Sequence, residues 1–405
     1  MYLRLIFAIT ISVITASHSL GFEVGGLIRK VDAEKRIASV FAGGRERTVK
    51  VSADAEILDE NGKPLQGGLS AKELSKGTIV TLTVQRIDNA PTIVVIQIGG
   101  QVRPASNSPG ADQPSVGKPS VGFKPLTEMS ADDRYKGEDG GLYGGGQNEI
   151  PETLRKFASE ENSRIKPVDK DGRPDTDGKI ALVSISMSNA TQEFSRFKQL
   201  ADADPQKSTN VAIVDCAQGG QTMARWANPK ADCWVEADRR LERAEVSHPQ
   251  VQIAWVKIAN AGPSGDLAEH GKQLQRDTQS VLVNLKDRFP NLRIVYLGSR
   301  IYGGWGDGKL NPEPYAYEGA FVVRWLIKDQ LENRDAATPL VLWGPYFWAD
   351  GLTPRKDDGL VWMRSDLAND GTHPSDSGRQ KVAEQLLAFF KTDEFTKVWF
   401  LKPLD

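Results

Sequence analysis

Short hydrophobic runs separated by polar turns mark the first part of the chain, from Phe22 to about Gly100. The runs are rich in β-branched residues and lie at 24–28, 37–41, 47–51, 79–84 and 92–98, with polar turns such as 59–63 between them. Regular short strands joined by polar turns are typical of a small antiparallel β-barrel or sandwich of about 80 residues.

A different pattern begins near Met129, where apolar runs alternate with longer amphipathic segments. Strand candidates lie at 180–185, 211–214, 251–256, 292–297 and 340–343, and helical periodicity is found near 192–204, 232–246, 266–288, 315–333 and 376–391. Buried strands that are each followed by a helix or a long loop predict a parallel sheet with helices on both faces. The active site of such a sheet lies at the carboxyl ends of its strands.

The segment between these two patterns is rich in Pro, Ser and Gly, with a near-repeat at 114–117 and 119–122. Such a sequence cannot bury enough apolar surface to order itself. We therefore expect a β domain over residues 20–100, a linker over 101–128 and an α/β domain over 129–405, with the two halves moving independently.

Residues 1–19 have the pattern of a signal peptide, in which Arg4 precedes an apolar run at 5–16. This run is too short to span a membrane comfortably, and no later stretch approaches about 18 uninterrupted apolar residues. No cysteine follows the signal, which excludes a bacterial-type lipid anchor. We expect a secreted or periplasmic protein without stable membrane insertion.

Charge and cysteine content narrow the possible partners. The 51 basic and 53 acidic residues leave a formal net charge of −2, which provides no field to hold a nucleic acid. The two cysteines, Cys216 and Cys233, predict a disulfide in an oxidising compartment, and a pair of buried free thiols is the alternative. A zinc site would need further ligands near them, so we predict no metal.

Candidate chemistry centres on His373, because the chain has only four histidines and His18 lies in the predicted signal peptide. Of the other three, only His373 follows a carboxylate, Asp370, by three residues in a turn rich in Gly, Thr and Pro. Such a turn can fold the Asp370 carboxylate onto one imidazole nitrogen and leave the other free to accept a proton from a nucleophile. The alternative is a helix cap made by residues 375–377.

Three other residues at strand ends could complete such a site. Ser188 follows the first predicted strand of the α/β domain, where a helix N-terminus favours a developing anion. The paired glycines Gly219 and Gly220 follow the second strand, and either could offer an unobstructed backbone N–H; Asn260 follows the third and could donate from its side chain. Taken singly, each has an ordinary alternative: Ser188 as a helix cap, Gly220 and Asn260 as turn residues.

In the order Ser, Gly, Asn and then Asp-x-x-His, these strand ends resemble the SGNH/GDSL hydrolase family of esterases and lipases over residues 130–400. The resemblance implies a flavodoxin-like three-layer fold with Ser188 as the nucleophile and His373 as the general base, oriented by Asp370. It also implies an oxyanion hole formed by the Ser188 and Gly220 backbone N–H groups and the Asn260 side chain. No metal or organic cofactor is implied.

The sequence departs from the family pattern in two places. The usual Gly-Asp-Ser is here Ser186-Met187-Ser188, which removes an aspartate that is not part of the triad. The usual Gly-x-Asn-Asp is reduced to Ala259-Asn260-Ala261, which keeps the amide donor and changes the residues that support it.

Aromatic loops late in the chain provide Trp305, Tyr346 and Trp348, which could stack on sugar rings or pack within the core. The sequence therefore predicts an exported serine esterase that removes acyl groups, such as acetyl, from a carbohydrate. The alternative is a non-catalytic carbohydrate-binding or cell-surface module on the same fold. For the β domain, which lacks catalytic groups, we expect a docking or spacing role.

Overall fold

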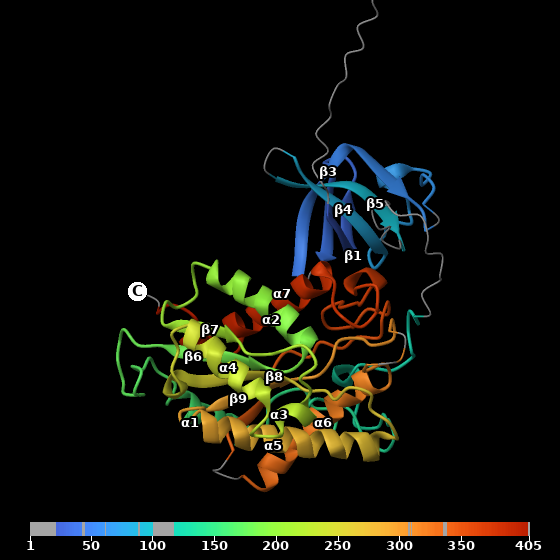
Figure 1. The fold of residues 1–405 in the computed structure, drawn as a ribbon. Helices are drawn as coiled ribbons and strands as arrows, with labels where there is room; N and C mark the ends of the chain where they lie inside the picture. Colours follow the sequence, from blue (N-terminus) through green and yellow to red (C-terminus); the bar gives the residue numbers. More distant parts are fainter. Residues whose placement is uncertain are drawn as a thin grey trace, which may run out of the picture.

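A computed structural model describes residues 22–42, 45–60, 62–87, 90–99, 117–306, 308, 310–334 and 338–403. These residues form a small β domain and a larger α/β domain (Figure 1). The predicted signal peptide, 1–19, and most of the predicted linker lie outside the described residues. None of the helices in the described part of the chain has the length and apolar composition that crossing a bilayer requires.

The β domain is a closed barrel with the strand order β1-β2-β3-β5-β4. Its strands are β1 Phe22–Asp32, β2 Ile37–Ala42, β3 Arg45–Leu58, β4 Ile79–Ile87 and β5 Ala90–Ile98. A 3-10 helix, Gly68–Ser70, lies in the connection from β3 to β4. All neighbouring strands are antiparallel except β3 and β5, which are parallel. The expected barrel is present, but a wholly antiparallel one is impossible, because an odd number of strands cannot alternate in direction around a closed ring.

The α/β domain contains one parallel sheet with the strand order β10-β9-β8-β6-β7. The strands are β6 Ile180–Ile185, β7 Val211–Asp215, β8 Val251–Lys257, β9 Ile294–Gly298 and β10 Leu340–Trp343. Nearly all of their residues are buried, because helices cover both faces of the sheet. The predicted three-layer arrangement agrees with this topology.

Helices α2 Ser188–Asp202 and α7 Asp376–Thr392 pack together on one face, and α5 Lys272–Arg288 and α6 Tyr315–Glu332 cover the other (Figure 1). The remaining helices are α1 Glu152–Asn162, α3 Met223–Trp226, α4 Asp232–Arg243 and α8 Lys397–Phe400. Short 3-10 helices lie at Leu126–Glu128, His248–Gln250 and Arg364–Asp366, and a π-helix lies at Leu267–Gly271. The start of α2 at Ser188, rather than at residue 192, matters most for the site.

Residues 117–128 fall within the predicted linker but pack against the α/β domain. The carboxylate of Asp350 accepts the backbone N–H groups of Val121 at 2.7 Å and Gly122 at 3.0 Å. The Lys118 N–H donates to the Gly304 carbonyl at 2.7 Å. This part of the chain therefore belongs structurally to the α/β domain.

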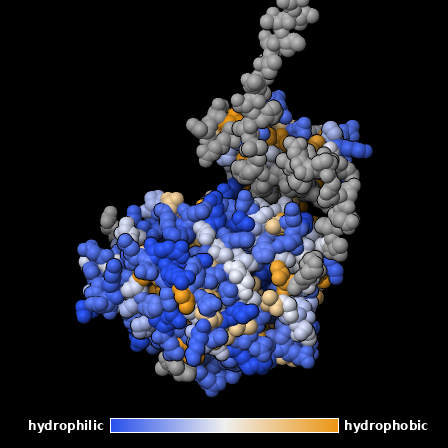
Figure 2. All heavy atoms as spheres, in the orientation of Figure 1, coloured by the Kyte–Doolittle hydropathy of each residue, from blue (hydrophilic) through white to orange (hydrophobic). Residues whose placement is uncertain are grey.

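The barrel lies above α2 and α7 (Figure 1), and Arg47 of β3 forms an ion pair with Glu384 of α7. The independent motion expected for the two halves stays a prediction. On the face shown in Figure 2, polar residues cover most of the α/β domain and hydrophobic residues form small separate groups.

Candidate active site

Ser188 lies where the chain leaves β6 and enters α2. Met187 has an extended backbone, with φ −101° and ψ −168°, and the helix begins at the next residue. The half-buried Ser188 hydroxyl is 2.7 Å from Nε2 of His373. No side chain caps the N-terminus of α2 by a hydrogen bond, so the structure does not use the Ser188 hydroxyl as a helix cap.

Asp370 holds the other side of the imidazole. Its Oδ2 is 2.5 Å from Nδ1 of His373, and its Oδ1 accepts the backbone N–H groups of Thr372 and His373, each at 2.9 Å. Ser375 caps α7 by accepting the Gly378 N–H, which leaves the Asp370 and His373 side chains free of capping. Nδ1 donating to a carboxylate leaves Nε2 as the acceptor for the serine proton.

The Asp370 carboxyl stays ionised because its hydrogen bonds outweigh its desolvation. Partial burial raises its pKa, whereas the hydrogen bonds from the His373 ring and from the Thr372 and His373 backbone lower it. The net effect is a pKa below the ordinary aspartate value. A carboxylate at this position orients the imidazole and stabilises it when it becomes protonated.

Two buried side chains contact the turn that carries His373. The Asn189 Nδ2 donates to the Thr372 carbonyl at 2.7 Å, and Nη2 of the buried Arg300 reaches the same carbonyl at 3.5 Å. Sequence reasoning missed both residues. Asn189 directly follows Ser188, and Arg300 comes just after β9, so reading every residue at the strand ends would have included them.

Hydrogen bonds connect the loops that follow β6, β7 and β8 at one edge of the sheet. The Gln218 N–H donates to the Ser186 carbonyl at 3.0 Å, and the Ser186 hydroxyl donates to the Lys257 carbonyl. The Met223 N–H donates to the Ala259 carbonyl at 3.2 Å. The three loops that carry Ser188, Gly220 and Asn260 are therefore directly linked.

Gly220 and Asn260, the two other predicted oxyanion residues, lie in these linked loops. Gly220 is exposed and has φ +75°, a backbone conformation that favours glycine. Asn260 accepts the Ala224 N–H through Oδ1 at 2.9 Å and donates to Asp277 through Nδ2 at 2.7 Å. An amide nitrogen has two hydrogens, so one donor beyond the Asp277 bond is available. The oxyanion roles of Gly220 and Asn260 stay predictions.

A buried ion pair lies between α2 and β8. Lys257 Nζ is 2.7 Å from Oε1 and 2.6 Å from Oε2 of Glu193, and the two side chains are 1% and 0% exposed. Burial lowers the pKa of Lys257 to about 8, although the Glu193 carboxylate opposes this shift. The pair connects the helix that begins at Ser188 to the strand that precedes Asn260.

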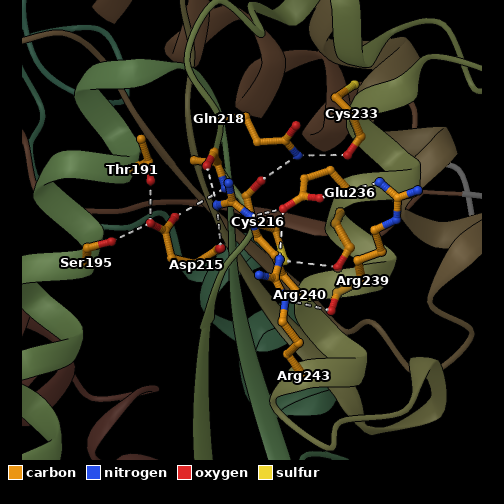
Figure 3. A network of polar contacts seen from close by, with 12 residues as sticks. Thr191, Ser195, Asp215, Cys216, Gln218, Cys233, Glu236, Arg239, Arg240 and Arg243 are labelled. Carbon is orange, nitrogen blue, oxygen red and sulfur yellow. Dashed lines mark hydrogen bonds and ion pairs between the residues drawn. The ribbon is translucent and has the colours of Figure 1, made fainter.

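Asp215, at the end of β7, organises a second buried polar network (Figure 3). Its carboxylate accepts the hydroxyls of Ser184 and Thr191, each at 2.5 Å, and of Ser195 at 2.6 Å. Arg240 of α4 donates to the Asp215 carbonyl at 3.0 Å. Burial raises the pKa of the Asp215 carboxyl, and the three hydroxyls oppose that shift. Because Thr191 and Ser195 belong to α2, the network fixes α2 to the sheet.

Two of the aromatic residues predicted to bind substrate are inside the core. The Trp348 side chain is fully buried and its Nε1 donates to Glu313 at 2.8 Å. Tyr346 is also buried, and its hydroxyl accepts the Leu126 N–H at 3.1 Å. Rings enclosed in this way offer no face to a sugar, so the alternative interpretation, core packing, describes both.

Trp305 is the exception, because it is half-buried and lies beside the histidine turn. A Cβ on Gly371 would lie 1.9 Å from the Trp305 carbonyl oxygen, so Gly371 allows this close approach. The Trp305 Nε1 donates to the Trp362 carbonyl at 2.8 Å, which fixes the ring.

The predicted disulfide is absent, since Cys216 and Cys233 are both buried free thiols. The Cys216 sulfur lies 3.9 Å from the Ala237 carbonyl, one turn of α4 beyond Cys233. Burial raises the pKa of both thiols, that of Cys233 to about 11. The disulfide prediction was wrong because the short separation in sequence does not direct the two side chains toward each other. Within the described residues, no group of three or more His, Cys, Asp or Glu side chains could hold a metal ion.

No family model and no curated protein match this sequence. Among solved structures, it is similar to a putative acylhydrolase from Bacteroides fragilis, with 14% identity and a TM-score of 0.31 over 60% of this chain and 99% of the other. It is similar to the periplasmic domain of the lipopolysaccharide acetyltransferase of Salmonella ser. Paratyphi A, with 12% identity and a TM-score of 0.29 over 59% and 96%. It is also similar to apo-CusF from Escherichia coli, with 11% identity and a TM-score of 0.15 over 21% and 95%. Similarities of this size do not assign a function to the chain.

Proposed function

We propose that the α/β domain is a serine hydrolase that cleaves carboxylic esters. The observation that carries this proposal is the continuous hydrogen-bonded chain from the Ser188 hydroxyl through His373 to Asp370, with contacts of 2.7 and 2.5 Å. A nucleophile within hydrogen-bond reach of a base, itself oriented by a third group, is the arrangement that covalent acyl transfer requires. This series of hydrogen bonds favours an enzyme over a non-catalytic binding module.

In the proposed reaction, Ser188 Oγ attacks the ester carbonyl carbon while its proton moves to Nε2 of His373. The Asp370 carboxylate stabilises the imidazolium, and the oxyanion accepts hydrogen bonds from the Ser188 and Gly220 N–H groups and the Asn260 amide. Collapse of the intermediate breaks the ester C–O bond, and His373 returns the proton to the departing alcohol. Water, deprotonated by His373, then attacks the acyl-enzyme, the bond from the acyl carbon to Ser188 Oγ breaks, and His373 returns the proton to Ser188 as the acid leaves.

The substrate class in this proposal is limited to carboxylic esters. The expectation of a carbohydrate rested on Trp305, Tyr346 and Trp348, and of these three only Trp305 is not fully buried. Export rests on residues 1–19, which lie outside the described part of the chain, and it stays a prediction.

The test compares a variant at Ser188 with a variant at another serine of the same domain. We expect Ser188→Ala to lower hydrolysis of p-nitrophenyl acetate by about a thousandfold or more. Ser280→Ala, at an exposed position on α5, is the matched control and should keep full activity. A fluorophosphonate should label the wild-type protein and not Ser188→Ala. An active Ser188→Ala protein, or no labelling of the folded wild type, would refute the proposal.

A further inference from the structure

The short helix α3, Met223–Trp226, contacts all three loops that carry the predicted oxyanion donors. These are the loop that leads from β6 to Ser188, the loop after β7 that carries Gly220, and the loop after β8 that carries Asn260. An oxyanion hole works only when its donors are held at fixed positions before the reaction begins. The contacts of α3 therefore bear directly on the proposed reaction.

Trp226 joins the first two of these loops through a single hydrogen. Its Nε1 is 3.1 Å from the Ser186 carbonyl oxygen and 3.1 Å from the Gln221 carbonyl oxygen. The indole has one N–H, so the two carbonyls share this donor. Two carbonyl oxygens brought this close to one another would repel each other if the hydrogen were removed. The Trp226 N–H therefore holds the Ser186 and Gln221 carbonyls together.

Each of these carbonyls lies close in the chain to a predicted donor. Ser186 precedes Ser188 by two residues, and Gln221 directly follows Gly220. A shift of either carbonyl therefore also shifts the neighbouring backbone N–H. Gly220 is exposed, whereas Trp226 is fully buried, so the shared hydrogen bond anchors an exposed turn to the core.

The backbone at the start of α3 orients the third predicted donor, the Asn260 amide. The Ala224 N–H donates to Asn260 Oδ1 at 2.9 Å, and the Met223 N–H donates to the Ala259 carbonyl at 3.2 Å. A backbone N–H can donate only to the oxygen of the amide, so this bond directs Nδ2 away from α3. The 2.7 Å bond from Nδ2 to Asp277 agrees with this orientation.

Neighbouring helices hold α3 in place. The Trp234 ring of α4 packs edge-on against the Trp226 ring, with 4.7 Å between the ring centroids. The Trp226 carbonyl accepts Nε1 of Trp234 at 3.1 Å and Nδ2 of Asn284, on α5, at 3.0 Å. Because these groups belong to a close-packed interior, Trp226 cannot move without displacing its neighbours.

We propose that Trp226 is a positioning residue, which sets the spacing between the Ser188 and Gly220 N–H groups for the oxyanion. The inference rests on the proposed esterase function and on the oxyanion roles predicted for these donors. Trp226 is fully buried, so it acts through the Ser186 and Gln221 carbonyls and not on the substrate itself. Its loss should weaken stabilisation of the transition state and leave binding of the ground-state ester unchanged.

The experiment replaces Trp226 with Phe in the full chain, which removes the indole N–H and keeps an aromatic ring in the core. A misplacement of about 1 Å can cost about a hundredfold in rate. We expect kcat for p-nitrophenyl acetate to fall about ten- to a hundredfold with little change in KM. Phenylboronic acid forms a tetrahedral adduct with a nucleophilic serine, and its affinity should fall by a similar factor.

Trp343→Phe is the matched control. The Trp343 indole is also buried and donates to the Leu142 carbonyl at 2.9 Å, but it lies on β10, at the edge of the sheet away from β6 and β7. This variant should keep the wild-type kcat and boronic acid affinity. Asn284→Ala, which removes the bonds to the Trp226 and Ala227 carbonyls, provides a second test if Trp226→Phe does not fold. It should also lower kcat with little change in KM.

The two proposals fail in different ways. If the wild type cleaves no ester in a Ser188-dependent manner, the proposed function itself is wrong, and the role of Trp226 is refuted with it. If hydrolysis depends on Ser188 but folded Trp226→Phe keeps the wild-type kcat, only the positioning role is refuted. Equal losses of kcat in Trp226→Phe and Trp343→Phe would also refute it, as would an unchanged kcat in Asn284→Ala if Trp226→Phe does not fold.

Discussion

The buried pair of Lys257 and Glu193 allows a quantitative test of how the nucleophile helix is held. Replacing Lys257 with Met removes the cation and leaves the Glu193 carboxylate, which is 0% exposed, without its ionic partner. Breaking a buried ion pair from one side costs about 3–5 kcal/mol, because an uncompensated charge remains in a medium of low dielectric. A domain has about 5–15 kcal/mol of total stability, so we expect a large fraction of it to be lost.

Removing both charges should cost much less than removing one. In Lys257→Met/Glu193→Met no charge is buried, and replacement of a buried pair by apolar side chains is often neutral or stabilising. We therefore expect the double variant to lie within about 1 kcal/mol of the wild type, and the coupling free energy between the two sites to reach several kcal/mol.

Tryptophan fluorescence during urea unfolding measures this directly. All nine tryptophans lie between residues 226 and 399, so the signal reports the α/β domain alone. Val283→Met, at a partly exposed position on α5, controls for a simple change to methionine. The reasoning would be refuted if Lys257→Met lost less than about 1 kcal/mol, or if the losses of the two single variants simply added in the double variant.

Three further outcomes follow from buried groups near the site. Asn189→Ala removes the 2.7 Å hydrogen bond that positions the turn carrying His373 through the Thr372 carbonyl. We therefore expect kcat for p-nitrophenyl acetate to fall about ten- to a hundredfold with little change in KM. An unchanged kcat would contradict a positioning role for Asn189. Burial raises the pKa of Glu313 from 4.5 to about 7. Between these pH values the native state therefore binds more protons than the unfolded chain. The free energy of unfolding should fall by on the order of 3 kcal/mol as pH rises from 4.5 to 7. The free energy of unfolding of Glu313→Gln, measured in urea at several pH values, should not show this decrease. If it depends on pH as steeply as that of the wild type, Glu313 is not the group responsible. Cys216 and Cys233 should both react with a thiol reagent after denaturation without reductant, and reductant should not change Tm. If the denatured protein shows no reactive thiols, the two cysteines are joined by a disulfide after all.

The sheet was predictable because its strands are continuous apolar runs, which local composition alone reveals. The strands β6, β7, β8 and β10 begin at the predicted residues, and β9 begins two residues later. The start of α2 was less predictable, because Ser188 and Asn189 have polar side chains that favour caps and turns in isolation. In the structure both side chains contact the histidine turn instead.

The proposed catalytic residues could be named from the sequence because they lie at a strand end and in one local turn. Asp370 and His373 are only three residues apart, so the geometry of a single turn can bring their side chains together. The buried partners were not visible, because Lys257 and Glu193 meet through the packing of α2 on the sheet and neither follows a recognisable spacing. The prediction that Tyr346 and Trp348 bind substrate was wrong for the same reason, since composition does not distinguish a ring in the core from one at the surface.

The sequence by itself predicted the barrel and the parallel sheet, and it named Ser188, His373 and Asp370 as candidates, whose side chains the structure brings together. These features follow from hydrophobic periodicity and from residues close together in the chain. Only the tertiary structure decided that Cys216 and Cys233 are separate thiols, that Tyr346 and Trp348 are enclosed, and that Lys257 and Glu193 form a buried ion pair. Each of these depends on the direction of side chains from segments far apart in sequence, which is set by packing and not by local pattern.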